Sequence, residues 1–578
     1  MLAIWRKRRR SVKIVLMAAL AIAALAVVPV AGARARLLGF LRSGSNLSQD
    51  ATLISAYPDV AVSDDGDWVA AVWTDGYQGT AGYKGHVYLR VASNGGVNLG
   101  DKIPVFVGGS SACASDAAVA ISGDDAHIAY VVFNDTCDNP SQIQVRYATC
   151  SLANGQCEEK TAAESVDTLA HKITWVDLAL DAGQNPHLVW AQYDADGKNG
   201  DIRYRAYDTG SSAWGVVEDV AVDGDNNVPA IAWADDRVQV VWQHVEGTGR
   251  TICYQRRDAG GWLYSPKTPY CFFGLLTTYA PENPDVAAGA GQLFVVWDQC
   301  SDPDHNPDPE YRVPCSMYRV MYRHWDGSLE RWSEDFEVGT NHAWIAAEDY
   351  DSLDDAPREE YVRYLRPAVS LNADGWPTAV WHVHHSQNGG EEEGGDESYA
   401  IHYSYALTGT ITGKPEWITT TVLGGYQSSW LGSAAVGVGT TSGEQRMHVV
   451  YMGKPGRDST DAWDVYYHGF SHNPAAQIDV PGIVLVGSTV TLDGSGSYDP
   501  QGLPLMSYDW SLTGKPTGSA AALSGSAPEA RTLTLDVLGY YTVTLEVATS
   551  LANSAPAVRT ILASDSVFYG YLPVVLRQ

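Results

Sequence analysis

The sequence predicts an all-β protein in which one structural unit is repeated around a ring. Seven times a short apolar run ends on an aromatic residue, at intervals of 52 to 84 residues. Turn residues, mainly glycine, asparagine and aspartate, separate these runs. A unit of this length, built from short apolar runs and turns, is typical of a circular β array. The closing residues are Trp73, Phe133, Trp190, Trp242, Trp297, Trp381 and Tyr451.

Each repeat has the parts of one propeller blade. The first copy contains four apolar segments, at 58–63, 68–73, 86–91 and 102–107. Turns that favour positive φ connect them, as expected for strands joined by hairpins. The second segment is almost continuously apolar, which suits a strand that is covered on both faces by neighbouring sheets. The tyrosines of the third segments are expected to pack between blades.

The seventh copy lacks its last strand. Its third segment, at 464–470, runs directly into sequence of a different kind. An apolar segment at 51–56 precedes the first repeat and can supply the missing strand, which would remove the free sheet edges. We therefore predict a seven-bladed β-propeller over residues 48–470, closed by an N-terminal strand and preceded by a linker at 34–47.

The repeat pattern resembles the BNR-type repeats of sialidase-like propellers of secreted bacterial proteins. The resemblance lies in the proline, alternating apolar residues, glycine and closing V-V-W of each unit. Only Ser63-Asp64-Asp65-Gly66-Asp67-Trp68 approaches the Asp-box of that family, and it is out of register. No F-R-I-P segment supplies an arginine, so no sialidase catalytic residue is assigned here.

Residues 473–563 resemble a PKD domain, an immunoglobulin-like β-sandwich. The resemblance rests on a turn, a core tryptophan and a final strand that occur in this order. The matching residues are Asp493, Gly494, Ser495, Ser497, Asp499, Pro500, Trp510, Gly539 and Tyr541. The tail at 564–578 resembles a short terminal element of other secreted bacterial proteins. It is compatible with a sorting or docking peptide and with an extra edge strand.

The N-terminus and the charge predict export. A basic cluster at 6–10 precedes an apolar stretch at 14–30 and the small residues Ala31-Gly32-Ala33, a pattern typical of a signal peptide at 1–33. An uncleaved membrane anchor is the alternative. The net charge of −30 repels phosphate backbones, so we expect no nucleic-acid partner. No later segment is apolar enough to span a membrane.

Eight cysteines suit an extracellular chain. Their number alone allows 105 pairings. The predicted blade register favours pairing between near neighbours. It selects the pairs Cys113–Cys137, Cys150–Cys157, Cys253–Cys271 and Cys300–Cys315.

Long loops are predicted on one face of the propeller, where the loops after the second strands emerge. Loops on a rigid scaffold are common binding surfaces. We therefore select as candidate ligand-binding residues Asp75, Asp135, Asp298, His382 and His384. For any single loop, a solvated loop without a ligand is the alternative.

One loop has the spacing of a calcium site. Oxygen donors alternate there with glycine at the bend, which suits a cation that takes six to eight oxygens. The candidate metal ligands are Asp194, Asp196, Asn199 and Asp201. An ordinary turn is the alternative, because the third aspartate and the distal glutamate of an EF-hand are missing. His382 and His384 are a second, weaker candidate for a metal.

The sequence contains no serine-hydrolase, zinc-protease or phosphate-loop motif. We interpret the chain mainly as a secreted or cell-surface binding and adhesion protein without catalysis. Its propeller face would bind a glycan or protein ligand, and the PKD-like domain would act as a spacer. The alternative is a glycan-active hydrolase or lyase. We expect a monomer, an extracellular glycan or protein as partner, and calcium as the cofactor.

Overall fold

The computed structural model describes residues 39–565, with gaps. The gaps are 50–53, 77–84, 110–111, 135–139, 161, 169, 274–279, 290, 301–317, 327–330, 339–359, 373–374, 388–395, 407–416, 422–433, 442–443, 454–462, 472–473, 475, 500–503, 550–552 and 555. The described residues form strands and turns without a helix, so the all-β prediction is confirmed. They contain no helix that could cross a membrane. The predicted signal peptide lies outside them.

Seven of the sheets follow one another along the chain, and we number them sheet 1 to sheet 7. Sheet 1 contains β2 (Ser55–Val62), β3 (Val69–Asp75), β4 (His86–Ser93) and β5 (Asn98–Phe106). Sheet 2 contains β6 (Ala112–Ser122), β7 (Asp125–Asn134), β8 (Gln142–Ser151), β9 (Cys157–Glu159) and β10 (Glu164–Asp167). Sheet 3 contains β11 (His171–Leu180), β12 (Pro186–Asp194), β13 (Asp201–Asp208), β14 (Ala213–Trp214) and β15 (Glu218–Ala221).

The remaining four of these sheets have the same order. Sheet 4 contains β16 (Asp225–Ala234), β17 (Arg237–Glu246), β18 (Gly249–Asp258), β19 (Gly261–Trp262) and β20 (Tyr270–Cys271). Sheet 5 contains β21 (Pro281–Gly289), β22 (Gln292–Cys300), β23 (Tyr318–Asp326), β24 (Arg331–Trp332) and β25 (Phe336–Glu337). Sheet 6 contains β26 (Glu360–Leu371), β27 (Pro377–Gln387), β28 (Asp396–Ala406) and β29 (Trp417–Thr421). Sheet 7 contains β30 (Ala434–Thr441), β31 (Glu444–Gly453), β32 (Asp464–Ser471) and β1 (Gly39–Asn46).

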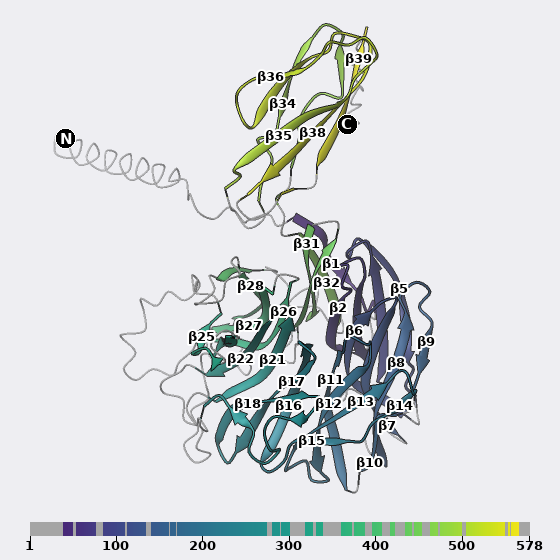
Figure 1. Cartoon of the computed structure of the whole chain (residues 1–578), viewed down its shortest axis with the longest axis vertical. Coiled ribbons are helices and arrows are strands. Elements are labelled where there is room, and N and C mark those ends of the chain that lie inside the picture. Colours follow the sequence, from purple (N-terminus) through teal and green to yellow (C-terminus); the bar gives the residue numbers. More distant parts are fainter. Residues whose placement is uncertain are drawn as a thin grey trace, which may run out of the picture.

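These sheets close into a ring (Figure 1). The first strand of each sheet contacts the first strand of the next, and β30 of sheet 7 contacts β2 of sheet 1. The first strands therefore surround a common axis, which is the arrangement of a β-propeller. The second strands are buried along most of their length, as their apolar sequences predict.

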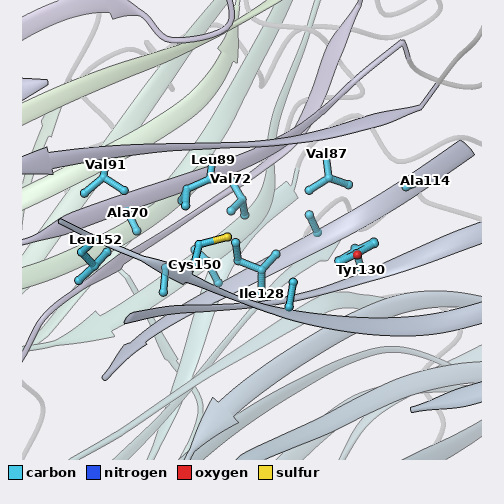
Figure 2. Packing of buried hydrophobic residues seen from close by; sticks show 14 of the residues in the cluster. Ala70, Val72, Val87, Leu89, Val91, Ala114, Ile128, Tyr130, Cys150 and Leu152 are labelled. Atoms are coloured by element: carbon cyan, nitrogen blue, oxygen red, sulfur yellow. The ribbon is translucent and has the colours of Figure 1, made fainter. Parts of the chain in front are cut away.

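Neighbouring sheets are held together by apolar side chains. Between sheets 1 and 2, valine, leucine and alanine side chains of β3 and β4 pack against Ala114, Ile128, Tyr130 and Leu152 (Figure 2). All of these side chains are buried, so each sheet covers the apolar face of the next. The predicted packing of the third-strand tyrosines is confirmed for six residues, which are buried: Tyr147, Tyr204, Tyr254, Tyr322, Tyr403 and Tyr466. Tyr88 is only partly buried.

The ring is closed by an N-terminal strand, but the predicted segment was wrong. The closing strand is β1, which pairs antiparallel with β32, so part of the expected linker is a strand. Residues 55 and 56 of the predicted closing segment instead begin β2, where Ala56 pairs with Thr74. The alternation of apolar and polar residues in this segment fits a strand at either place. Asp59, which follows in the same strand, accepts a hydrogen bond from the Val119 N–H of sheet 2, and this contact places the strand at the ring axis.

The aromatic register also needs one correction. In sheet 2, Tyr130 occupies the place that Trp73 and Trp190 occupy in sheets 1 and 3, because Ala129 pairs with Ala118 as Val72 pairs with Asp59. Tyr130 is fully buried, whereas the predicted Phe133 lies further along the strand and is partly exposed. A single apolar run, residues 128–133, contains both aromatic residues, so the run alone does not show which of them takes this place.

The C-terminal part contains two more sheets that enclose one core. Sheet 8 contains β33 (Ile483–Leu485), β39 (Ala557–Ser564), β38 (Gly539–Ala548) and β35 (Ser507–Gly514). Sheet 9 contains β34 (Thr489–Asp493), β37 (Ala530–Thr534) and β36 (Leu523–Ser524). Leu492 and Leu533 of sheet 9 share a buried cluster with Tyr541 and Leu545 of sheet 8.

Candidate functional site at the ring axis

The first strand of each of sheets 1 to 6 carries a β-bulge at the same place. In sheet 1 the pairing with β3 skips from Ala56 to Asp59, and the other five sheets repeat this shift. One residue in each bulge has a left-handed backbone, with φ between 47° and 56°. None of them is glycine, although this conformation is costly for other residues and concentrates at functional sites. The six residues are Tyr57, Asp116, Trp175, Val228, Asn283 and Arg366.

Three of these residues meet although their sheets are not all neighbours in the ring. The ring centroids of Tyr57 and Trp175 are 6.4 Å apart in an edge-to-face arrangement. The Arg366 guanidinium lies 5.9 Å from the centroid of the Trp175 ring. These residues come from sheets 1, 3 and 6, and side chains of such sheets meet only near the axis. With Asp116 they form what we call the axial cluster.

Asp116 brings an acid into the axial cluster. Its Oδ2 accepts a 2.9 Å hydrogen bond from Ser115 Oγ, and its carboxylate accepts a hydrogen bond from the Trp175 backbone N–H. Burial raises the pKa of Asp116, and the nearby Arg366 charge only partly opposes this effect. The residue as a whole is half-buried. A carboxyl with a raised pKa is suited to donate a proton.

Asp298, a predicted ligand residue, lies directly behind the axial cluster. Its side chain has no exposed surface. Its oxygens accept hydrogen bonds of 3.1 Å from Asn283 Nδ2 and of 3.2 Å from the Arg366 backbone N–H. Burial raises the pKa of Asp298 to about 7. The carboxyl therefore holds two left-handed residues of adjacent sheets in place and does not itself line the site.

Asp75, another predicted ligand residue, is part of the ring closure. It is fully buried and contacts Lys102 Nζ at 2.5 Å, Ser55 Oγ at 2.6 Å and Trp73 Nε1 at 2.7 Å. Burial raises its pKa against the opposing Lys102 charge. Lys102 also donates to the Ser48 carbonyl at 3.0 Å, beside β1. Asp75 thus anchors the lysine that holds the N-terminal segment.

The other predicted loop residues contribute less to the site. His382 is buried within β27, where it pairs with Leu365 and Ile401. His384 follows on the same strand, but its side chain lies outside the described residues, as does all of Asp135. In sheet 1 the bulge lies near the start of β2 and opposes the last residues of β3, the end at which the sequence predicts the long loops.

The predicted calcium loop forms a hydrogen-bonded turn. Asn199 Nδ2 donates to Asp194 Oδ2 at 2.7 Å, so the amide oxygen is not the atom that faces this carboxylate. Asp196 lies 3.6 Å from Lys198 Nζ, and Asp201 lies 2.7 Å from Arg203. The described part of the chain contains no group of three or more histidine, cysteine or acidic side chains arranged for a metal. Calcium binding stays a prediction.

Three further aspartates line the axis below the axial cluster. Asp59, Asp177 and Asp285 occupy equivalent positions in sheets 1, 3 and 5. Each Oδ1 accepts the N–H of the next residue, and each Oδ2 accepts an N–H from the following sheet, all at 2.8 Å. Burial raises the pKa of Asp59 to about 6 and that of Asp285 to about 7. The pKa of Asp177 is raised further by the two other carboxyls.

Two of the four predicted disulfides are confirmed. Cys150 is bonded to Cys157 across the end of β8, and Cys253 is bonded to Cys271 across β18 and β20. Cys113 and Cys300 are also disulfide-bonded. Their predicted partners, Cys137 and Cys315, lie outside the described residues. Disulfides of this kind are typical of extracellular proteins.

No model of a known protein family matches the chain, and no curated protein matches its sequence. Among solved structures it is similar to Trypanosoma rangeli sialidase, with 10% identity, a TM-score of 0.38, and coverage of 93% of this chain and 91% of that one. A polysaccharide lyase of the ulvan lyase type has 13% identity, a TM-score of 0.36, and coverage of 66% and 89%.

The β-propeller domain of the trilobed protease from Pyrococcus furiosus has 11% identity, a TM-score of 0.35, and coverage of 72% and 94%. Likenesses of this size carry no argument about function. The propeller architecture rests on the order, pairing and contacts of the sheets described above.

The sequence analysis did not select the residues of the axial cluster. A signal was nevertheless present, because Tyr57, Asn283 and Arg366 each precede the proline that opens the repeat motif. Once the bulge is known to lie at this place in the repeat, large or polar residues found there in several repeats are expected to lie at the axis.

Proposed function

We propose that this chain is a secreted, glycan-active enzyme whose sugar site is the axial cluster. The observation that carries the proposal is the convergence of Tyr57, Trp175, Arg366 and Asp116 from four sheets at the axis. Aromatic faces with a few directed polar groups are the usual lining of a small-molecule site. In this proposal the rings pack against a sugar, and Asp116 donates a proton to the oxygen of the bond that breaks.

The charges around the axis favour a sugar without net charge. Arg366 lies near Asp298, whose carboxylate opposes part of its positive charge. The chain as a whole has a net charge of −30, which repels polyanions. We therefore propose a neutral glycan as the ligand.

The competing proposal is a binding and adhesion protein without catalysis. The same aromatic rings would then hold the sugar, and Asp116 would only accept a hydrogen bond. In this case the raised pKa of Asp116 is a consequence of burial alone, as it is for many buried carboxyls.

A panel of neutral glycans, assayed for both binding and cleavage, separates the two. Trp175→Ala should abolish binding and cleavage. Asp116→Asn should abolish cleavage and preserve binding. Tyr264→Ala, on the exposed outer part of sheet 4, is the matched control and should change neither. Binding that survives in Trp175→Ala would overturn the axial site, and full cleavage by Asp116→Asn would show that Asp116 is not the proton donor. Binding without cleavage by the unchanged chain would favour the binding protein.

Further parts of the proposal concern the whole molecule. We propose that the seven ring sheets are the blades of a seven-bladed propeller, that the C-terminal sandwich is of the PKD type, and that the chain is exported by its N-terminal segment. The disulfides support an extracellular location. N-terminal sequencing of the protein from the culture medium tests the export, with cleavage expected after Ala33.

A further inference from the structure

Sheet 8 carries exposed apolar side chains at the end where β33 and β39 finish and β38 begins. Ile483, Leu485, Leu538 and Tyr540 are large apolar side chains with exposed fractions of 54%, 47%, 52% and 66%. Ile483 and Tyr540 are both cross-strand neighbours of Leu562, so three apolar residues form a row across β33, β39 and β38. Leu485 neighbours Ser564, and Leu538 directly precedes β38. We call these five side chains, including Leu562, the apolar row.

The surface is unusual for this chain. Apolar side chains that gather on one face of a soluble protein commonly mark a site of contact. The exposed faces of β34 and β35 carry threonine, serine and aspartate, and the other exposed large apolar residues described in the sandwich, Met506 and Val558, lie outside the row. β33 is also the edge strand of its sheet in the described residues, so no described strand pairs with its outer side.

The chain itself supplies an apolar segment at this place. β39 ends at Ser564, which pairs with Leu485 in the apolar row. The 13 residues that follow Asp565 contain a single charged side chain, Arg577. Nine of them are apolar or aromatic: Val567, Phe568, Tyr569, Tyr571, Leu572, Pro573, Val574, Val575 and Leu576.

We propose that the apolar row is the docking surface of the C-terminal tail, residues 566–578. Both partners are apolar, and the tail starts at the end of the strand that carries the middle of the row. Covalent connection gives the tail an effective concentration in the millimolar range, which no free partner matches in solution. A second copy of the chain is disfavoured as the occupant, because two molecules with a net charge of −30 repel one another.

Hydrogen exchange of the full chain and of a variant that ends at Asp565 tests the proposal. Removal of the tail should speed exchange in β33 and at the start of β38 severalfold, while β34 and the ring sheets stay unchanged. A synthetic peptide of residues 566–578, added to the shortened chain, should restore the protection. Equal exchange in both chains would overturn the proposal.

A cysteine pair locates the tail directly. Leu485→Cys combined with Tyr569→Cys should form a disulfide under mild oxidation, since docking brings the two positions together. The matched control, Val216→Cys with Tyr569→Cys, places the first cysteine on an exposed residue of sheet 3 and should not cross-link within the chain. Intermolecular cross-links at Leu485, with dimers of both full and shortened chains, would show a second copy on the row and overturn the proposal.

Discussion

The first strands of sheets 1, 3 and 5 differ consistently from those of sheets 2, 4 and 6 at one position, the first paired residue after the bulge. Sheets 1, 3 and 5 have Asp59, Asp177 and Asp285 there, and sheets 2, 4 and 6 have Ala118, Ala230 and Ala368. Each aspartate accepts one N–H from its own strand and one from the following even-numbered sheet. Three carboxyls thus satisfy six inward-facing N–H groups, and each links two sheets.

The ring is therefore built of three linked pairs of sheets and one remaining sheet. Sheet 7 has Ala435 in the equivalent region and is joined to sheet 1 in another way, through the N-terminal segment. Asp464 of sheet 7 accepts hydrogen bonds from Asn46 Nδ2 at 2.6 Å and from Ser48 Oγ at 2.5 Å. Arg90 of sheet 1 donates to the Leu47 carbonyl at 2.9 Å.

Removal of the closing segment should have the largest effect on the stability of the ring. A chain that starts after residue 49 lacks β1 and the contacts of Asn46 and Ser48 with Asp464. It exposes the edge of β32 and the buried Leu47 site. We expect loss of the cooperative melting transition of the ring, measured by calorimetry. A ring that melts as before would show that sheets 7 and 1 hold together without the segment.

The hydrogen bonds by which the axial aspartates link two sheets should make the next largest contribution to stability. Asp177→Asn keeps one acceptor oxygen but turns an amide N–H₂ group towards a backbone N–H. We expect a loss of about 1–3 kcal/mol in the free energy of unfolding, the cost of an unpaired buried donor. The exposed turn residue Asp124, changed to Asn, is the control and should stay within about 0.5 kcal/mol. Denaturant unfolding measures both, and equal values would remove the structural role of the link.

An aspartate placed in sheet 2, 4 or 6 should destabilise the ring. In Ala230→Asp the new carboxylate meets the Val286 N–H, which already donates to Asp285. The variant buries a charge without a free donor, so we expect a loss of at least about 1 kcal/mol. An unchanged or raised melting temperature would mean that the alternation of aspartate and alanine carries no structural information.

The axial carboxyls also predict how stability depends on pH. Their folded pKa values lie above the ordinary 3.8, at about 6 for Asp59 and about 7 for Asp285. Through these carboxyls the folded chain binds more protons than the unfolded chain between about pH 4 and pH 7, so their contribution to stability falls as the pH rises through this window. Buried histidines such as His127, whose pKa burial lowers to about 4, act in the opposite direction. We therefore compare two chains: from pH 5 to pH 8, the melting temperature of the unchanged chain should fall more, or rise less, than that of Asp177→Asn. Equal changes in both chains would contradict this assignment.

Calcium removal from the predicted calcium loop should have the smallest effect on the melting temperature. If Asp194, Asp196, Asn199 and Asp201 bind calcium, a chelator lowers the melting temperature and calcium restores it by mass action. Asp196→Ala should then abolish the response to calcium while the ring stays folded. An identical melting curve in chelator and in calcium would make the loop an ordinary turn.

The sequence predicted the elements of the ring because their apolar periodicity is local. Strand positions, turns and the near-neighbour disulfides Cys150–Cys157 and Cys253–Cys271 depend on residues close in the chain. The closing strand was misplaced because β1 and β32 pair over more than 400 residues, and Gly39–Asn46 has little apolar character. A pattern search finds a strand by its side chains, whereas β1 is identified by the pairing of its backbone with β32.

The candidate site was harder to predict for a related reason. Asp75 and Asp298 follow buried strands at the expected loop face, but both are buried themselves and support neighbouring residues. Trp175 and Tyr57 are brought together by the closure of the ring and by bulges that a period of two residues does not reveal. Their role depends on which sheets face each other across the axis.

The closing strand also sets a time for folding. Asn46 must wait for Asp464, which follows it by 418 residues. At a synthesis rate of about 5–20 residues per second, the interval between the two is roughly 20–80 s. During that time β1 has no partner, and the open edge of the growing ring is available to any other strand. The ring is therefore most vulnerable to misassembly just before sheet 7 is complete, and the first of its described strands to be made is the last of them to be paired.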